Sequence, residues 1–198
     1  MVLDPKGNTG AQQGRRAFVV RGLGVLAGLV VAGTSSAAAN AAQDDPARAT
    51  RLRAVDDEWR FCERCYGMIH VYFGLGVGRC PGASNGHSVA GYQFRLPYDV
   101  PETATAQANW RYCERCLGLF YFGYPGGGWC PAGGSHLAKG YNYVLPHDVV
   151  ETPTSQAYWR FCTKCYALFY WGYPTKGSCP AGGGHEAAGY NFVIPHYS

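Results

Sequence analysis

Short aromatic and apolar runs, separated by turns rich in glycine and proline, recur along most of the chain. The runs at 119–122 and 168–171 are continuous, whereas those at 141–145 and 190–194 begin as an alternation of apolar and polar residues and end at a proline. Both patterns are typical of short strands bounded by turns. Helical spacing of apolar residues is found only weakly, at 47–59. The pattern therefore predicts an all-β fold.

The runs belong to a repeat. Trp59, Trp110 and Trp159 open three similar copies, 51 and 49 residues apart. Each copy reads Trp-Arg-Phe/Tyr-Cys-x-x-Cys, an aromatic run, a glycine-rich turn, Cys-Pro, a second glycine-rich loop to His, and Gly-Tyr-x-Phe/Tyr. A period near fifty residues indicates a repeat architecture. The predicted organisation after residue 41 is an N-terminal segment and three repeats, at 42–58, 59–109, 110–158 and 159–198.

All nine cysteines and three of the six histidines fall in registered sets, one set per repeat. Each set has the spacing C-x2-C-x13/14-C-x5/6-H and supplies three thiolates and one imidazole, the ligand complement of a closed tetrahedral zinc site. The sets are Cys62, Cys65, Cys80 and His87; Cys113, Cys116, Cys130 and His136; and Cys162, Cys165, Cys179 and His185. We therefore expect three structural Zn²⁺ ions.

Disulfides are the alternative, because the chain has features of an exported protein and export usually means oxidising conditions. Three cysteines cannot pair within one repeat, and nine cannot pair completely across repeats. The odd number and the histidine that closes each set favour metal.

The N-terminus has the pattern of an export signal. The segment Gly14-Arg15-Arg16-Ala17-Phe18-Val19-Val20 resembles the twin-arginine motif, although Gly, Val and Val replace its usual Ser/Thr, Leu and Lys. A short apolar stretch at 22–32 and an A-x-A site at 39–41 complete a signal peptide over residues 1–41, with an uncleaved anchor as the alternative. The resemblance implies export of an already folded protein to the periplasm or the medium, with no stable membrane insertion after cleavage. Thiols metallated in the cytosol would then leave protected.

Most of the net positive charge of the chain, +3 of +4, lies in residues 1–41. Residues 42–198 hold 13 basic and 12 acidic residues. Each Cys3His site with Zn²⁺ would add one negative charge, which gives a net charge of about −2. No basic face for nucleic acid is expected.

A unit of about fifty residues has a small core and usually needs a staple such as a metal. The C-x-x-C turns resemble zinc-ribbon knuckles, in which Gly67 and Gly118 would permit the turn around the metal, although Ala167 takes this position in the third copy. Three such units predict a compact pseudo-threefold body of β-trefoil type, with three beads in a row as the alternative. The 28 aromatic residues of 42–198 favour the compact form, with the three repeat-opening tryptophans in its core.

The motifs Trp-Arg-Phe/Tyr-Cys-x-x-Cys and Cys-Pro-Ala-Gly-Gly-Gly/Ser-His resemble a tandem repeat of secreted bacterial proteins, which is sometimes appended to hydrolase-like domains. The resemblance covers residues 59–198. It implies an accessory or stand-alone secreted module and no particular activity.

Catalysis by the metals is not expected, because four protein ligands fill each tetrahedron and no catalytic motif accompanies them. We therefore assign no catalytic residue, and a zinc-dependent hydrolase remains an alternative. Of the spare histidines, His70 has no counterpart in the other copies, while His147 and His196 correspond to Tyr98 in the first. They predict no fourth metal set.

Binding is favoured instead. Aromatic residues beside glycine-rich turns suit flat polar ligands such as sugars, and three sites on one body would give avidity for a polysaccharide or cell-surface polymer. The alternatives are a protein-interaction module or inhibitor of a secreted partner, and aromatic residues that simply pack in the core. The candidate ligand-binding residues are Tyr72, Tyr121, Tyr170, Trp171, Tyr124, Tyr173, Trp129, Asn142 and Asn191.

Overall fold

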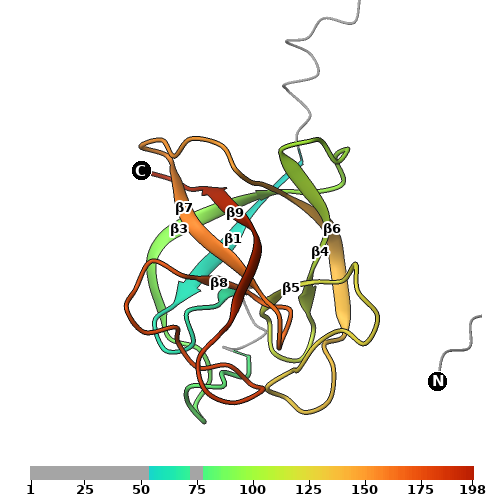
Figure 1. Ribbon diagram of the computed structural model, residues 1–198, viewed down its shortest axis with the longest axis vertical. Helices are drawn as coiled ribbons and strands as arrows, with labels where there is room; N and C mark the ends of the chain where they lie inside the picture. Colours follow the sequence, from blue (N-terminus) through green and yellow to red (C-terminus); the bar gives the residue numbers. More distant parts are fainter. Residues whose placement is uncertain (1–53, 72–77) are drawn as a thin grey trace, which may run out of the picture. The chain divides into compact units, whose positions relative to one another are not determined.

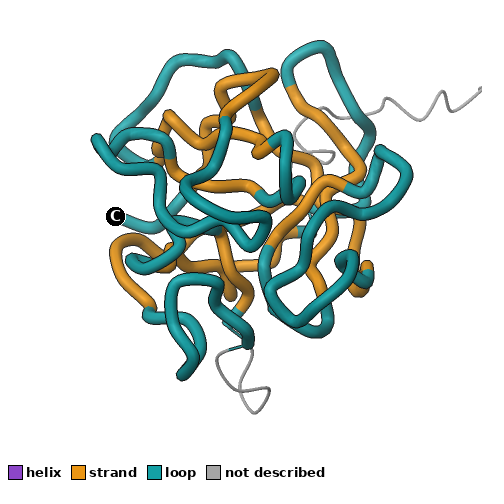
Figure 2. The backbone as a smooth tube through the Cα atoms, turned by 60° about the horizontal axis from the view of Figure 1, so that its bottom comes forward, coloured by secondary structure: helices purple, strands orange, loops and turns teal. Residues whose placement is uncertain are grey.

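The computed structural model describes residues 54–71 and 78–198, and these residues form an all-β protein with no helix (Figures 1 and 2). The expected all-β class is confirmed. The predicted signal peptide, residues 42–53 of the N-terminal segment and the candidate Tyr72 lie outside the described residues. Within those two ranges, no helix has the length and apolarity needed to cross a membrane.

Three similar three-stranded antiparallel sheets make up the described part of the chain, one per repeat. In each sheet the long strand that carries the repeat's tryptophan lies between a short strand and a second long strand, in the orders β2-β1-β3, β5-β4-β6 and β8-β7-β9. This central strand begins four residues before the tryptophan. The weak helical spacing before Trp59 was misleading, because Val55 to Trp59 are part of strand β1. The strands are β1 Val55–Cys62, β2 Met68–His70, β3 Val89–Pro97, β4 Ala106–Cys113, β5 Leu119–Tyr121, β6 Ala138–Pro146, β7 Ser155–Cys162, β8 Leu168–Tyr170 and β9 Ala187–Pro195.

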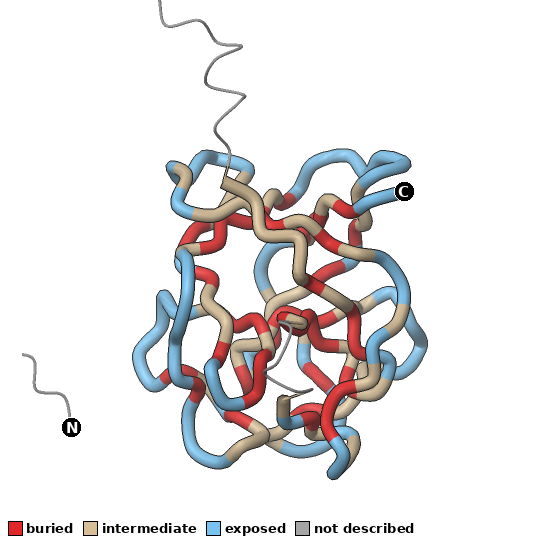
Figure 3. The backbone as a smooth tube through the Cα atoms, turned by 180° about the vertical axis from the view of Figure 1, so that it is seen from behind, coloured by how far each residue is buried: buried red, intermediate tan, exposed pale blue. Residues whose placement is uncertain are grey.

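The tryptophan that opens each repeat is the centre of the core, as expected. Trp59, Trp110 and Trp159 are fully buried and belong to one hydrophobic cluster that draws residues from all three sheets. Each indole meets an aromatic ring of the following repeat edge-on, with ring centroids 5.0–5.1 Å apart: Trp59 with Tyr143, Trp110 with Phe192 and Trp159 with Phe94. The interior is therefore shared between repeats, while exposed residues lie mainly in the connecting loops (Figure 3).

Backbone hydrogen bonds join the sheets in a cycle. The amide of His70 donates to the carbonyl of Leu117 at 2.8 Å, in the second repeat. The corresponding amides of Tyr121 and Tyr170 donate to Tyr166 and Tyr66, at 2.9 and 2.8 Å. The third repeat thus bonds back to the first, so the repeats are not separate beads in a row.

The turn after each C-x-x-C pair differs from the expectation based on glycine. The left-handed residue is the one directly after the second cysteine, with φ near 63° at Tyr66, Leu117 and Tyr166. The residue after it, Gly67 in the first repeat, accepts a hydrogen bond from the amide of Cys62 at 3.0 Å. Alanine is tolerated there in the third repeat because this position needs no positive φ.

Candidate metal centres

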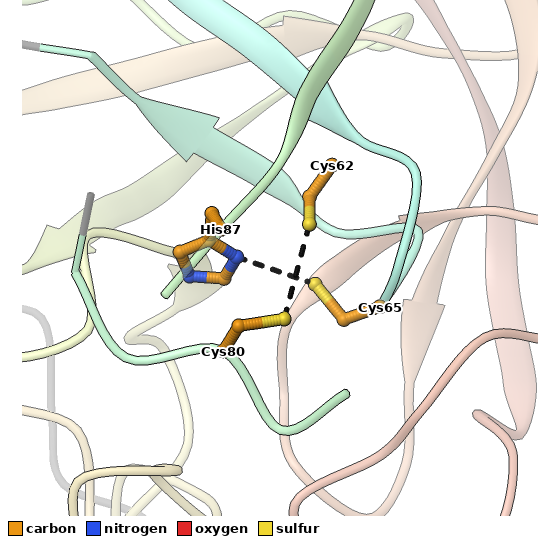
Figure 4. A group of neighbouring side chains, drawn as sticks. All are labelled: Cys62, Cys65, Cys80 and His87. Atoms are coloured by element: carbon orange, nitrogen blue, oxygen red, sulfur yellow. Dashed lines mark hydrogen bonds between the residues drawn. The ribbon is translucent and has the colours of Figure 1, made fainter. Parts of the chain in front are cut away.

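Each Cys3His set converges from a strand end, a tight turn and a loop. In the first repeat, Cys62 is the last residue of β1, Cys65 lies in the turn before β2, and Cys80 and His87 lie in the segment before β3. The short turn brings the first two thiols together, and the loop brings the other two ligands over them (Figure 4). The other two repeats place their four ligands in the same way.

The distances fit a tetrahedral metal site. The Sγ atoms of the first and third cysteines lie 3.9, 3.8 and 4.0 Å apart in the three repeats. The histidine Nδ1 lies 3.5, 3.4 and 3.3 Å from the second cysteine's Sγ. Tetrahedral angles with bonds of about 2.3 Å to sulfur and about 2.0 Å to nitrogen would give S···S near ~3.8 Å and S···N near ~3.5 Å.

The cysteines are free thiols, and all are buried. A disulfide would require sulfurs about 2.0 Å apart, half of the observed separation. In each set the four ligand atoms lie within 4.8 Å of one another. The three groups therefore fit three metal sites, each with four protein ligands.

The outer nitrogen of the ligand histidine reaches into the next repeat. Nε2 of His87 bonds to the carbonyl oxygen of Cys116 at 3.0 Å, and Nε2 of His185 bonds to that of Cys65 at 3.1 Å. Such a bond fixes the tautomer that leaves Nδ1 free to bind a metal. Among the described residues, Nε2 of His136 has no hydrogen-bond partner. Two of the sites are thus tied directly to the neighbouring C-x-x-C turn.

Each turn also receives a glycine from the repeat before it. A Cβ on Gly78, Gly128 or Gly177 would lie 2.3–2.4 Å from the carbonyl oxygen of Cys116, Cys165 or Cys65, respectively. These glycines have φ of 61–64°, which glycine adopts without steric cost. The repeats therefore interlock at the metal centres, where the backbone of one lies directly on the C-x-x-C turn of another.

Without metal, the histidine and the second cysteine of each set would hold protons. Burial acts to lower the pKa of His87, but hydrogen bonds and the charges of Cys62 and Cys80 outweigh it and raise this pKa to about 9. The same causes raise the pKa of His136 and of His185 to about 9. Hydrogen bonds with the first and third thiols raise the pKa of Cys65. A metal ion must displace these protons to bind.

Acid is accordingly expected to release the metals. Below a pH of about 6.5, the imidazole is protonated in the folded and in the unfolded metal-free chain, so each site loses at least about tenfold in apparent affinity per pH unit. The measurement is metal release to a chromogenic indicator as the pH is lowered from 8 to 4. Release that does not depend on pH would contradict thiolate and imidazole ligation.

The candidate ligand-binding tyrosines lie where one repeat meets the next. Tyr121 and Tyr124 line a groove of about 240 Å³ between the second and third repeats, together with Gln107 and Tyr190. Tyr170 and Tyr173 take the corresponding places between the third and first repeats, where both contact Phe61. The structure thus brings these four tyrosines together in two pairs.

The two candidate tryptophans are placed differently. Trp129 is 60% exposed and lies at the rim of an open depression of about 730 Å³, formed where the three Cys-Pro loops meet. Trp171 is half-buried, with the ammonium of Lys176 3.8 Å from its ring centroid. Trp129 therefore offers the more accessible ring.

The two candidate asparagines are engaged in the sheets. Oδ1 of Asn142 accepts the amide hydrogen of Asn109 at 2.8 Å, and Oδ1 of Asn191 accepts that of Tyr158 at 2.9 Å. Asn109 and Tyr158 have φ of 68° and 66° at irregularities in the strand register. The side-chain oxygens of both asparagines therefore stabilise these strand irregularities through backbone hydrogen bonds.

Sequence reasoning missed a fourth cluster, which is outside the Cys3His sets. Asp56, Glu58 and His70 place their polar atoms within 4.8 Å of one another. Burial acts to raise the pKa of Asp56, but hydrogen bonds from His70 and Tyr143 hold it below its usual value. The signal that could have revealed the cluster is that none of its residues is repeated: Gln107, Asn109 and Tyr121 take these places in the second sheet.

Comparison with known proteins gives no relative: no family model, no curated protein and no solved structure matches this chain.

Proposed function

We propose that the chain is an exported binding module for a carbohydrate polymer, built on three structural zinc ions. Zinc is the metal that best suits three thiolates and one imidazole in a closed tetrahedral site. The twin-arginine-like segment of residues 1–41 supports export, and residues 59–198 would belong to the secreted bacterial tandem repeats that they resemble. The cyclic contacts between the sheets support a pseudo-threefold, β-trefoil-like arrangement.

The observation that carries the binding proposal is the position of the exposed aromatic rings. Tyr124 and Tyr173 are about half exposed and lie at the junctions between repeats, and Trp129 lies at the rim of the central depression. Aromatic faces beside polar groups such as Gln107 suit the apolar faces and hydroxyl groups of sugar rings. Several such sites on one body would retain a repetitive polymer through avidity.

Retention on insoluble polysaccharides and cell-wall preparations tests this function. The unmodified protein is expected to sediment with at least one of these polymers at moderate salt. Tyr124→Ala or Trp129→Ala is expected to weaken binding about 3- to 10-fold, the effect of losing one aromatic stacking contact. Val150→Ala removes another exposed apolar side chain far from these rings in sequence and serves as the control. The absence of retention on every polymer would reject the proposal.

The metal part has its own test. Protein purified without chelator should contain about three zinc ions per chain by elemental analysis. Replacement by Co²⁺ should give intense thiolate-to-cobalt bands that correspond to three closed Cys3His sites. Mapped disulfides or alkylatable thiols in the purified protein would overturn the assignment.

A further inference from the structure

The junction of the first and second repeats differs from the corresponding junction of the second and third. It contains a groove of about 660 Å³, whose lining includes Asp56, Glu58, His70, Tyr141 and Tyr143. The corresponding groove has a volume of about 240 Å³. In it, Gln107 takes the place of Asp56, Tyr121 that of His70 and Phe192 that of Tyr143.

Three of the lining residues form a ready-made set of ligand atoms. Nε2 of His70 lies 3.0 Å from Oδ2 of Asp56 and 3.9 Å from Oε2 of Glu58. Ligand atoms about 2.1 Å from one metal ion, at angles between 90° and 110°, lie about 3.0–3.4 Å apart, so a small adjustment of Glu58 would complete the set. The side chains of His70 and Asp56 are 8% and 11% exposed, whereas that of Glu58 is 35% exposed. The set is thus anchored on its inner side and open toward the groove.

Tyr143 supports this set from the second repeat. Its hydroxyl donates to Oδ2 of Asp56 at 2.6 Å, and Oδ1 of Asp56 accepts the amide hydrogen of Glu58 at 3.1 Å. A carboxylate held by such outer partners is the usual arrangement around a metal ligand. The phenylalanines that take this position in the other repeats, Phe94 and Phe192, could not supply the bond.

The replacement of glutamine by aspartate is unfavourable for the core. Trp110 and Trp159 donate their indole N–H to Gln107 and Gln156, at 3.2 and 3.0 Å. Among the described residues, the N–H of Trp59 has no partner, although Trp59 is fully buried. A buried donor without a partner costs about 1–3 kcal/mol, so the surroundings of Trp59 lose a stabilising contact where aspartate stands in place of glutamine. Local departures of this kind are expected at functional sites.

The charge of the groove favours a cation. Its lining contains three carboxylates, those of Asp56, Asp57 and Glu58, and neither lysine nor arginine. A concave surface lined by one sign of charge concentrates counter-ions of the opposite sign.

We propose that Asp56, Glu58 and His70 bind one divalent first-row transition-metal ion, with Tyr143 orienting Asp56. One imidazole and two carboxylates suit Zn²⁺ or Mn²⁺ better than thiolate-seeking ions. Three protein ligands leave coordination positions toward the groove for water or for an oxygen atom of a bound molecule. This fourth site is exchangeable, unlike the three closed Cys3His sites, and it does not depend on the carbohydrate proposal.

The test is titration calorimetry on the full chain, after elemental analysis has shown that the three Cys3His sites are loaded with zinc. Mn²⁺ is the first probe, because it prefers oxygen and nitrogen ligands to thiolates and reports binding by electron paramagnetic resonance. Zn²⁺ is titrated separately. One further ion per chain is expected with either metal.

Variants that copy the sister repeats test the ligands. His70→Tyr, with the residue found at positions 121 and 170, is expected to weaken binding at least 100-fold. Tyr143→Phe, with the residue found at positions 94 and 192, is expected to weaken it about 10- to 100-fold through Asp56. His147→Tyr is the matched control. It removes a buried histidine that lies 3.1 Å from Asp148 and replaces it with the residue found at position 98.

Each variant is first checked for three bound zinc ions and an unchanged circular dichroism spectrum. If His70→Tyr does not fold, Tyr143→Phe and Asp56→Gln decide the question. Binding of no further ion to the zinc-loaded protein would overturn the proposal. So would equal affinity in the variants that fold, or an equal loss in His147→Tyr.

Discussion

Removal of the three metals with a chelator is expected to unfold all three repeats together. Each Cys3His site contributes on the order of 10–16 kcal/mol of apparent binding energy when it holds structural zinc, which is comparable to the whole stability of an ordinary domain, about 5–15 kcal/mol. Without metal, each repeat would hold three buried cysteines and a histidine close together with no ion to balance their charges, which destabilises the folded state. Because the tryptophans of all repeats share one cluster, loss of one site removes support from the others.

The measurement is near-ultraviolet circular dichroism and thermal unfolding before and after chelation. We expect loss of the aromatic signal and of the cooperative transition, and their recovery when Zn²⁺ is added back. Cys116→Ser, which removes one ligand of the second repeat, should lower the stability of the whole chain. Ser135→Ala, in the same Cys3His loop, should change it little. A chelated protein that keeps its signal and its Tm, or three separate transitions, would contradict a shared metal-dependent core.

The second large effect is expected at Gly177, where the third repeat lies on the C-x-x-C turn of the first. Alanine at this position would place its Cβ 2.3 Å from the carbonyl oxygen of Cys65, which also accepts the hydrogen bond from His185. The left-handed φ of 62° costs a non-glycine residue about 1–2 kcal/mol, and the overlap with a fixed carbonyl adds about 1–3 kcal/mol. The Tm of Gly177→Ala should fall by about 10 °C.

Gly183→Ala separates the two causes. Gly183 lies in the same repeat and has φ of 65°, but a Cβ there would meet nothing within 4 Å. The Tm of Gly183→Ala should fall by only about 2–8 °C, because this variant has the cost of the left-handed conformation without a steric overlap. Equal losses in the two variants would show that the contact between the third repeat and Cys65 contributes nothing to stability.

The metal ligands could be predicted because their information is local in the chain. Two cysteines with two residues between them can face one ion across a tight turn, and the repetition of the spacing excludes coincidence. The conformation of that turn was harder to predict. The conspicuous glycine at position 67 suggested the left-handed residue, yet Tyr66 adopts it. The sequence alone does not show whether residue 66 or residue 67 adopts the left-handed conformation, because the hydrogen bonds and ligands that the turn encloses decide it.

The contacts between repeats could not be predicted, because they depend on which copies touch. His87 and its acceptor on Cys116 lie 29 residues apart, and His185 and Cys65 lie 120 apart. The same holds for Tyr143 and Asp56, which are separated by 87 residues and meet only because the second repeat packs on the first. The sequence shows that Asp56 and His70 depart from the repeat, but it does not show that Tyr143 contacts Asp56.

The aromatic runs show a related difficulty. In a strand, successive side chains point to opposite sides, but both sides of β5 are covered: Leu119 packs in the core shared by the sheets, and Phe120 packs against the second Cys3His set. Phe120 is fully buried, Tyr121 is half-buried and Phe122 is exposed, although all three belong to one run. Candidate surfaces therefore needed the structure before they could be separated from the core.

The cyclic hydrogen bonds between the sheets have a consequence for how many copies the ring can hold. Every repeat offers the amide at the end of its short strand as donor and a carbonyl in its C-x-x-C turn as acceptor, and all three of each are used when the third repeat meets the first. A fourth copy would find no junction. The chain is thus equivalent to a closed trimer whose subunits are tethered in line by the segments between β3 and β4 and between β6 and β7. A single repeat has both halves of the junction, and we expect it to assemble with two further copies of itself.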